Sequence, residues 1–181
     1  EMDHHNPRLT EDLVLVLEQS QAIQEHYHIP DLTWFPLNVL AELATNIVDP
    51  SHREGKPVTL VVFPTSDWNT AFHRNSDFWA DILNTGQRFE LFQAATEDDM
   101  VAAVTVTATA HGPIQTFILG GHGTRRDLQL SKQRFFPTEK NWVDIGDPFK
   151  GLKDSFTHSA QMVLFSCSTN KTGGPEGQHN L

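Results

Sequence analysis

The sequence predicts an α/β fold in which helices flank both faces of a mainly parallel β-sheet, preceded by two further helices. Two observations carry this prediction. Short, unbroken apolar runs recur after residue 57, and segments with helical features separate them. Strands and helices that alternate in this way form parallel sheets through right-handed crossovers. Before residue 57, apolar residues recur at helical spacing instead.

The first part of the chain is expected to be helical after a polar leader of residues 1–9. A capping pattern at Thr10 opens a first helix, which Pro30 ends. The apolar stripe expected on this helix consists of Leu13, Val16, Leu17 and Ile23. A second helix, Leu37–Val48, lies between two prolines. Residues 1–55 are therefore expected to form a helical segment ahead of a core at residues 56–181.

The core is expected to alternate between strands and helices. The predicted strands are Val58–Phe63, Phe89–Phe92, Gln115–Leu119 and Gln161–Phe165, with a small β excursion at Leu128–Leu130. The predicted helices are Ser76–Asn84, capped by Ser76, a helix from Thr96 to His111, and Pro148–Phe156. In sheets of this kind, ligands bind beyond the carboxyl ends of the strands.

Composition excludes several classes of function. The chain has 181 residues with 13 basic and 23 acidic side chains, a net charge of −10, and the basic residues are scattered. Neither nucleic acid nor anionic lipid is therefore an expected partner. No apolar run approaches the roughly 20 residues that span a bilayer. No signal peptide is visible, which favours a cytoplasmic protein or an effector secreted by another route.

The ten histidines do not follow a metal-binding pattern. No His-Glu-x-x-His or Cys-x-x-Cys motif occurs. We therefore expect surface histidines, no metal and no other cofactor.

Two of the predicted strands end in residues with reactive side chains. Gln115–Leu119 leads into Gly-Gly-His122-Gly123, and Gln161–Phe165 leads into Ser-Cys167. If these strands are parallel neighbours, the imidazole and the thiol emerge at the same edge of the sheet. An imidazole can take the proton of a thiol and later protonate a leaving amine. The backbone amides of Gly123 and Cys167 are candidate oxyanion donors.

Each half of this pair also has a purely structural explanation. The glycines around His122 could supply positive φ angles in a turn, and Cys167 could be a buried thiol. Cys167 is the only cysteine, so the chain can form no internal disulfide. The catalytic interpretation is favoured because the only cysteine and the only glycine-flanked histidine both follow predicted core strands.

These motifs resemble the clan CD, or caspase-like, cysteine peptidases. A hydrophobic strand ending in His-Gly is followed about 45 residues later by one ending in Ser-Cys. The group includes caspases, gingipains, legumains, separases and toxin self-processing domains, and the likeness is greatest to bacterial members. The resemblance covers residues 56–181. It implies a three-layer sandwich, His122 as general base and acid, Cys167 as nucleophile, and an oxyanion held by amides near Gly123 and Cys167.

The chain also departs from these relatives. Caspases carry Gln-Ala before the nucleophilic cysteine, whereas Phe165 and Ser166 stand here, so aspartate specificity is not expected. Asp67 follows the first predicted strand, where many relatives carry a charged residue that binds the substrate side chain before the scissile bond. It favours Arg or Lys there, although a turn-forming aspartate explains the residue equally well. Trp68 and Ser166 complete the candidate substrate-binding residues.

The expected function is that of a cysteine endopeptidase that cleaves a peptide or protein through a thioester intermediate. The chain could also be one domain of a larger polypeptide. A domain that keeps the fold but only binds a partner is the main alternative. Transfer of the acyl group to a nucleophile other than water is a third. Sequence alone does not separate the third from the first.

Overall fold

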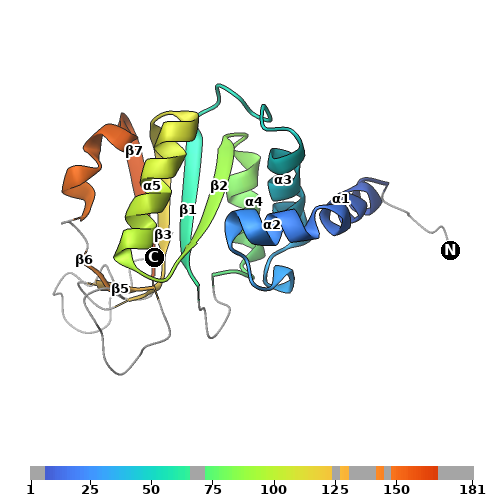
Figure 1. The fold of residues 1–181 in the computed structure, drawn as a ribbon, viewed down its shortest axis with the longest axis horizontal. Helices are drawn as coiled ribbons and strands as arrows, with labels where there is room; N and C mark the ends of the chain where they lie inside the picture. Colours follow the sequence, from blue (N-terminus) through green and yellow to red (C-terminus); the bar gives the residue numbers. More distant parts are fainter. Residues whose placement is uncertain (1–6, 66–71, 124–126, 131–141, 145–147, 167–181) are drawn as a thin grey trace.

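One parallel sheet of four strands forms the centre of the molecule (Figure 1). The computed structural model describes residues 7–65, 72–123, 127–130, 142–144 and 148–166. The strands are β1 (Val58–Pro64), β2 (Arg88–Ala94), β3 (Ile114–Gly120) and β7 (Phe156–Phe165), in the order β2-β1-β3-β7. All three pairings are parallel. The predicted mixed α/β fold with a parallel sheet is therefore confirmed.

Helices cover both faces of this sheet. The chain passes from β1 to β2 through α4 (Ser76–Asn84) and from β2 to β3 through α5 (Glu97–His111). Side chains of α4 enter one hydrophobic cluster with alternate residues of β1, and side chains of α5 enter a second cluster with the others. The result is three layers. β1 is buried along its whole length, as expected for a strand covered on both faces.

The two crossover helices begin at side-chain caps. Thr96 Oγ1 accepts a hydrogen bond from the Asp99 amide at 3.2 Å, and Asp99 Oδ2 accepts one from the Thr96 amide at 3.0 Å. This capping box confirms the predicted start of α5. At α4 the cap is Asn75, whose side chain accepts from the Phe78 amide at 3.1 Å, so the prediction that Ser76 caps the helix was wrong.

The N-terminal part contains three α-helices rather than the predicted two. They are α1 (Pro7–Glu18), α2 (Ser20–Tyr27) and α3 (Leu37–Val48), with a short 3₁₀ helix, η1 (Leu32–Trp34), before α3. The backbone leaves the α-helical region at Gln19 (φ −99°, ψ 6°), which divides the first predicted helix in two. The second predicted helix has the bounds expected between its prolines. The predicted division at residue 55 stays a prediction.

The apolar stripe expected on the first helix is only half correct. Val16 and Ile23 are buried in the cluster shared with the sheet. Leu13 and Leu17 are 47% and 65% exposed. Because α1 packs mainly on α3, only the side of α1 that carries Val16 is covered.

The segment before β7 is not the α-helix predicted at Pro148–Phe156. It forms two 3₁₀ helices, η2 (Pro148–Gly151) and η3 (Lys153–Ser155), and Phe156 already belongs to β7. Glycine has a low helix propensity, and Gly151 ends the first turn after four residues. β7 therefore begins five residues earlier than predicted.

A second, antiparallel sheet follows β3 directly. It consists of β4 (His122–Gly123), β5 (Asp127–Gln129) and β6 (Trp142–Asp144), in the order β4-β5-β6. β5 corresponds to the predicted β excursion. Since β4 starts two residues after β3 ends, this small sheet lies at the carboxyl edge of the large one (Figure 1).

None of the helices described is both long enough and apolar enough to cross a membrane.

Candidate functional site

The candidate site lies where β3 and β7 end. These strands are parallel neighbours, and the last pair in their register is Gly120 with Phe165. The amide of Gly121 donates a further hydrogen bond to the Phe165 carbonyl at 3.2 Å. His122 is the second residue after Gly120, and Cys167 is the second residue after Phe165. The strand arrangement on which the sequence argument depended is therefore present, while Cys167 itself lies outside the described residues.

Two glycines let the chain pass closely between neighbouring residues just before His122. A Cβ at Gly120 would lie 2.5 Å from Phe63 Cδ1, and a Cβ at Gly121 would lie 2.8 Å from the Gln129 carbonyl oxygen. Neither glycine has a positive φ. Gly120 and Gly121 therefore do not supply the positive φ angles that the structural alternative assumed. Their role is close packing.

The backbone of His122 is held by the small sheet. His122 pairs with Gln129, and Gly123 pairs with Leu128. Leu128 is fully buried, so the pairing strand is itself anchored in the core of the α5 face. His122 remains half-buried, which leaves part of it accessible. A histidine held by its backbone ladder, yet partly open to solvent, can exchange protons with a ligand.

Phe72 contacts the ends of both β3 and β7 through its ring, and no sequence pattern predicted this role. Its ring contacts the His122 imidazole edge-on, with centroids 5.2 Å apart and planes at 67°. The same ring contacts Phe165 edge-on at 5.5 Å. Phe72 is only 3% exposed. An isolated phenylalanine before a helix carries no periodic pattern, so only the tertiary structure brings it to His122.

Stacked aromatic rings fix the end of β7. Phe165 stacks on Phe78 of α4, with centroids 4.6 Å apart and planes at 11°. Phe78 stacks in turn on Phe63 of β1 at 5.6 Å. Such pairs contribute about 0.5–1.5 kcal/mol each beyond the area they bury. The residue before Ser166 is thus firmly positioned.

One histidine contradicts the expectation of surface histidines. His73 is fully buried beside the aromatic cluster. Its Nε2 lies 3.2 Å from Gln93 Nε2, and its carbonyl accepts a hydrogen bond from Trp79 Nε1 at 2.9 Å. Its ring also meets Phe35 edge-on at 5.1 Å. These contacts make His73 part of the core.

The remaining predicted site residues fall into two groups. Gly123 lies in β4, and Ser166 follows β7 directly. Ser166 is half-buried, and its buried Oγ has no hydrogen-bond partner in the part of the chain that the structure describes. Asp67, Trp68 and Cys167 lie outside the described residues.

Metal ligands do not gather in the described ranges, where no three His, Cys, Asp or Glu side chains lie close enough to share an ion. Comparison of the chain with models of known protein families and with curated proteins finds no match.

Proposed function

We propose that this chain is a cysteine endopeptidase with a caspase-like fold, in which His122 and Cys167 form a catalytic dyad. The observation that supports this most is the pairing of β3 with β7. Gly120 and Phe165 are register partners, and each candidate catalytic residue follows its own partner by two positions. Because His122 and Cys167 lie equally far beyond paired residues of parallel strands, their side chains are expected at the same edge of the sheet.

In this mechanism His122 accepts the proton of the Cys167 thiol, and the thiolate attacks the carbonyl carbon of the peptide bond. The amides of Gly123 and Cys167 donate hydrogen bonds to the oxyanion that forms. His122 then returns the proton to the leaving amine, and a thioester remains on the sulfur. Water, activated by His122, hydrolyses the thioester and regenerates the thiol. The chemistry requires no cofactor.

The surroundings of His122 are suited to this role. Its ladder with Gln129 fixes the backbone, and contact with the Phe72 ring, whose plane lies at 67° to that of the imidazole, limits rotation of the imidazole. A general base contributes most when its ring is held in one orientation. Because Phe72 contacts Phe165 as well, its ring links the end of β7 to the residue that follows β3.

For the substrate we propose a peptide with Arg or Lys before the scissile bond, which the Asp67 carboxylate would bind. Trp68 and Ser166 are the proposed neighbours of the substrate chain. The position of Ser166, between the end of β7 and Cys167, supports its part in the proposal.

Labelling of the thiol tests the dyad directly. Since Cys167 is the only cysteine, alkylation by iodoacetamide followed by mass spectrometry reports on this residue alone. We expect rapid labelling at pH 6, where an ordinary thiol with a pKa near 8.5 is almost fully protonated. His122→Ala should slow it by about 10²-fold or more, the lower range for loss of a general base.

The matched control is His158→Ala, which removes an exposed histidine from the strand that leads to Cys167. This variant should label at the parent rate. Equal labelling rates for the parent and His122→Ala would contradict the dyad. So would a thiol that reacts only after unfolding, which would instead favour a binding domain that has kept the fold.

Cleavage of a peptide library then tests the substrate. We expect hydrolysis after Arg or Lys, and Asp67→Asn should lower kcat/KM for these peptides relative to peptides with an apolar residue there. An unchanged preference would remove Asp67 from the site without affecting the dyad. Rapid, His122-dependent labelling without any peptide hydrolysis would contradict the peptidase proposal.

A further inference from the structure

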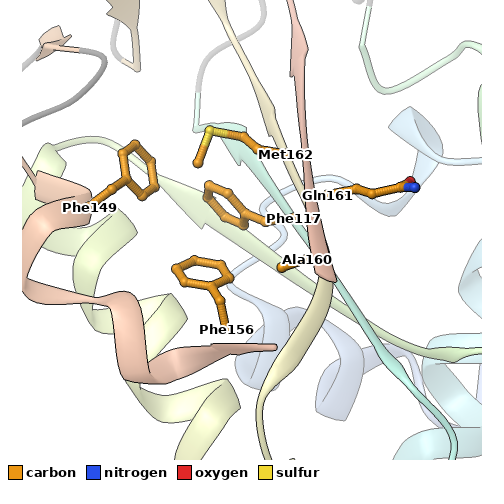
Figure 2. Close-up of a pocket in the computed structure, with 6 residues that line it drawn as sticks. All are labelled: Phe117, Phe149, Phe156, Ala160, Gln161 and Met162. Carbon is orange, nitrogen blue, oxygen red and sulfur yellow. The ribbon is translucent and has the colours of Figure 1, made fainter. Parts of the chain in front are cut away.

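The two faces of the sheet differ in what their aromatic side chains surround. On the α5 face, the rings of Phe117, Phe149 and Phe156 and the Met162 thioether surround a pocket of about 200 Å³ (Figure 2). On the α4 face, aromatic rings surround the imidazole of His73 instead. This histidine is fully buried, and the mechanism proposed above does not use it.

Several elements hold His73 in place. Its Nε2 lies 3.2 Å from Nε2 of Gln93 in β2, and because an amide nitrogen can only donate, the imidazole nitrogen is the acceptor. Trp79 Nε1 of α4 donates to the His73 carbonyl at 2.9 Å. The rings of Trp34 and Phe35 lie 5.2 and 5.1 Å from the imidazole. The side chain and the backbone of His73 are thus both anchored in the core.

Phe72, the residue before His73, contacts the candidate site. Its ring lies 5.2 Å from that of His122 and 5.5 Å from that of Phe165. Phe72 and His73 also share a neighbour, since their rings lie 5.6 and 5.8 Å from the ring of Phe63. Consecutive Cα atoms are only about 3.8 Å apart, so a displacement of His73 also moves Phe72.

We propose that His73 is a positioning residue for His122. Its buried imidazole anchors the turn before α4 through Gln93, and the turn holds the Phe72 ring against the His122 imidazole. This turn belongs to neither a helix nor a strand, so side-chain contacts fix its place. The consequence for catalysis rests on the proposed dyad, where a misplacement of about 1 Å can lower a rate by about 10²-fold.

A purely structural role for His73 makes different predictions. Replacement of a buried side chain that only stabilises the core lowers the free energy of unfolding and leaves the surroundings of His122 unchanged. A positioning role changes those surroundings as well. The test therefore needs a signal from His122 itself in addition to a stability measurement.

NMR of ¹³C-labelled histidine gives that signal. The Cε1 proton of His122 is assigned by its loss in His122→Ala. In His73→Leu this signal should shift, because the Phe72 ring no longer lies in the same place beside the imidazole. Labelling of Cys167 by iodoacetamide at pH 6 should slow by about tenfold, less than the loss expected for a misplacement of a full ångström.

A conservative variant and a core variant serve as controls. His73→Gln brings a side-chain oxygen close to the position of the imidazole Nε2, so the Gln93 amide keeps an acceptor. This variant should restore most of the labelling rate. Leu43→Ala shortens a fully buried side chain of α3 in the same hydrophobic cluster. It should lower the stability but leave the His122 signal and the labelling rate unchanged.

The outcomes separate this inference from the proposed function. An unchanged His122 signal in folded His73→Leu would overturn the positioning role, as would an equal shift in Leu43→Ala. A shifted signal with labelling at the parent rate would overturn its part in catalysis. If His73→Leu does not fold, Gln93→Leu removes the same contact from β2 and carries the same expectations. If labelling of the parent chain does not depend on His122, the dyad is contradicted, and the His122 signal still decides whether His73 positions it.

Discussion

The two edges of the sheet differ in how their backbone groups are used. On the β2 side, two backbone carbonyls accept hydrogen bonds from side chains: Asn46 Nδ2 donates to the Phe89 carbonyl of β2 at 2.9 Å, and Arg53 Nη1 donates to the carbonyl of Gln87, the residue before β2, at 2.7 Å. At β7 the outer side has no partner strand among the described residues, and apolar side chains are exposed there. Neither edge has a further strand among the described residues, but side chains bond to backbone carbonyls on the β2 side. We call the β2 side the closed edge and the β7 side the open edge.

This difference separates a stabilising side of the molecule from the side on which we propose the functional site. The closed edge contains a buried ion pair, with Arg88 Nε 3.0 Å from Glu90 Oε1, and His111 Nε2 lies 3.1 Å from the same oxygen. The open edge leads along β7 to Ser166 and so to the candidate nucleophile. Catalysis is proposed on this side, where apolar side chains of β7 remain exposed.

The largest expected effect comes from removing the buried ion pair beside the closed edge. Arg88→Ala removes the cation from Glu90 and the Nη1 donor from the carbonyls of Pro50 and His52. Burial already raises the pKa of Glu90, and Arg88 opposes that rise. Loss of one partner of a buried pair costs about 3–5 kcal/mol. Urea denaturation of the variant should show this loss, whereas Gln161→Ala on the open edge should change the free energy of unfolding by less than about 0.5 kcal/mol.

A loss of less than about 1 kcal/mol in Arg88→Ala would mean that the closed edge does not stabilise the fold, and the contrast between the edges would disappear. Glu90→Gln provides a further comparison, because it keeps the shape of the side chain and removes the charge.

A smaller effect is expected from the glycines that precede the candidate site. Gly121→Ala would place a Cβ 2.8 Å from the Gln129 carbonyl, a backbone atom that can only move with β5. We expect a loss of about 1–3 kcal/mol in the free energy of unfolding. Labelling of Cys167 should also slow, because the adjacent His122 shifts. Gly151→Ala is the matched control, since its Cβ meets no atom within 4 Å and its φ is not positive. Equal behaviour of the two variants would show that the ladder of β4 and β5 does not position His122.

The elements that the sequence predicted best are those whose local signals agree with their packing. Val58–Phe63 is apolar throughout because it is buried on both faces. Leu37–Val48 begins after one proline and ends shortly before another. The cap at Thr96 is visible as a short motif and is present as hydrogen bonds. In each case the local pattern and the tertiary environment require the same structure.

The parts that could not be predicted depend on contacts between distant segments. The break at Gln19 is seen in its backbone angles, and no proline or glycine in the sequence marks it. The sequence placed His122 after a strand correctly, but it could not show that β3 and β7 are neighbours. It also could not show that Phe72 reaches the imidazole, or that the glycine before His122 is required by Gln129.

The closed edge should also make stability depend on pH. Burial lowers the pKa of His111 from its ordinary 6.5, helped by the charges of Arg88 and His26. Burial lowers the pKa of His26 as well, with His28 as a second cause. Because both pKa values are lower in the folded state, the unfolded chain binds more protons below about pH 6.5. The free energy of unfolding should therefore fall as the pH drops from 7 to 5.5.

Glu90 acts in the opposite direction, because its pKa is raised and its contribution is lost as the pH rises above its ordinary 4.5. The double variant His26→Gln/His111→Gln separates the two effects. The difference between this variant and the parent should decrease or change sign between pH 7 and 5.5. A constant difference over this range would show that neither histidine couples to folding.

The smallest change in stability is expected at the open edge, where a charge should alter association instead. Val163→Lys places an ammonium group on an exposed position of β7, and its free energy of unfolding should stay within about 0.5 kcal/mol of the parent. Concentrated protein should aggregate more slowly on mild heating, as measured by light scattering, because the charged edge no longer pairs with other chains. Val106→Lys, at a 55% exposed position of α5, adds the same charge away from the edge and should have a weaker effect. If both variants slowed aggregation equally, added charge alone would explain the result, and β7 would be no more open to pairing than the rest of the surface.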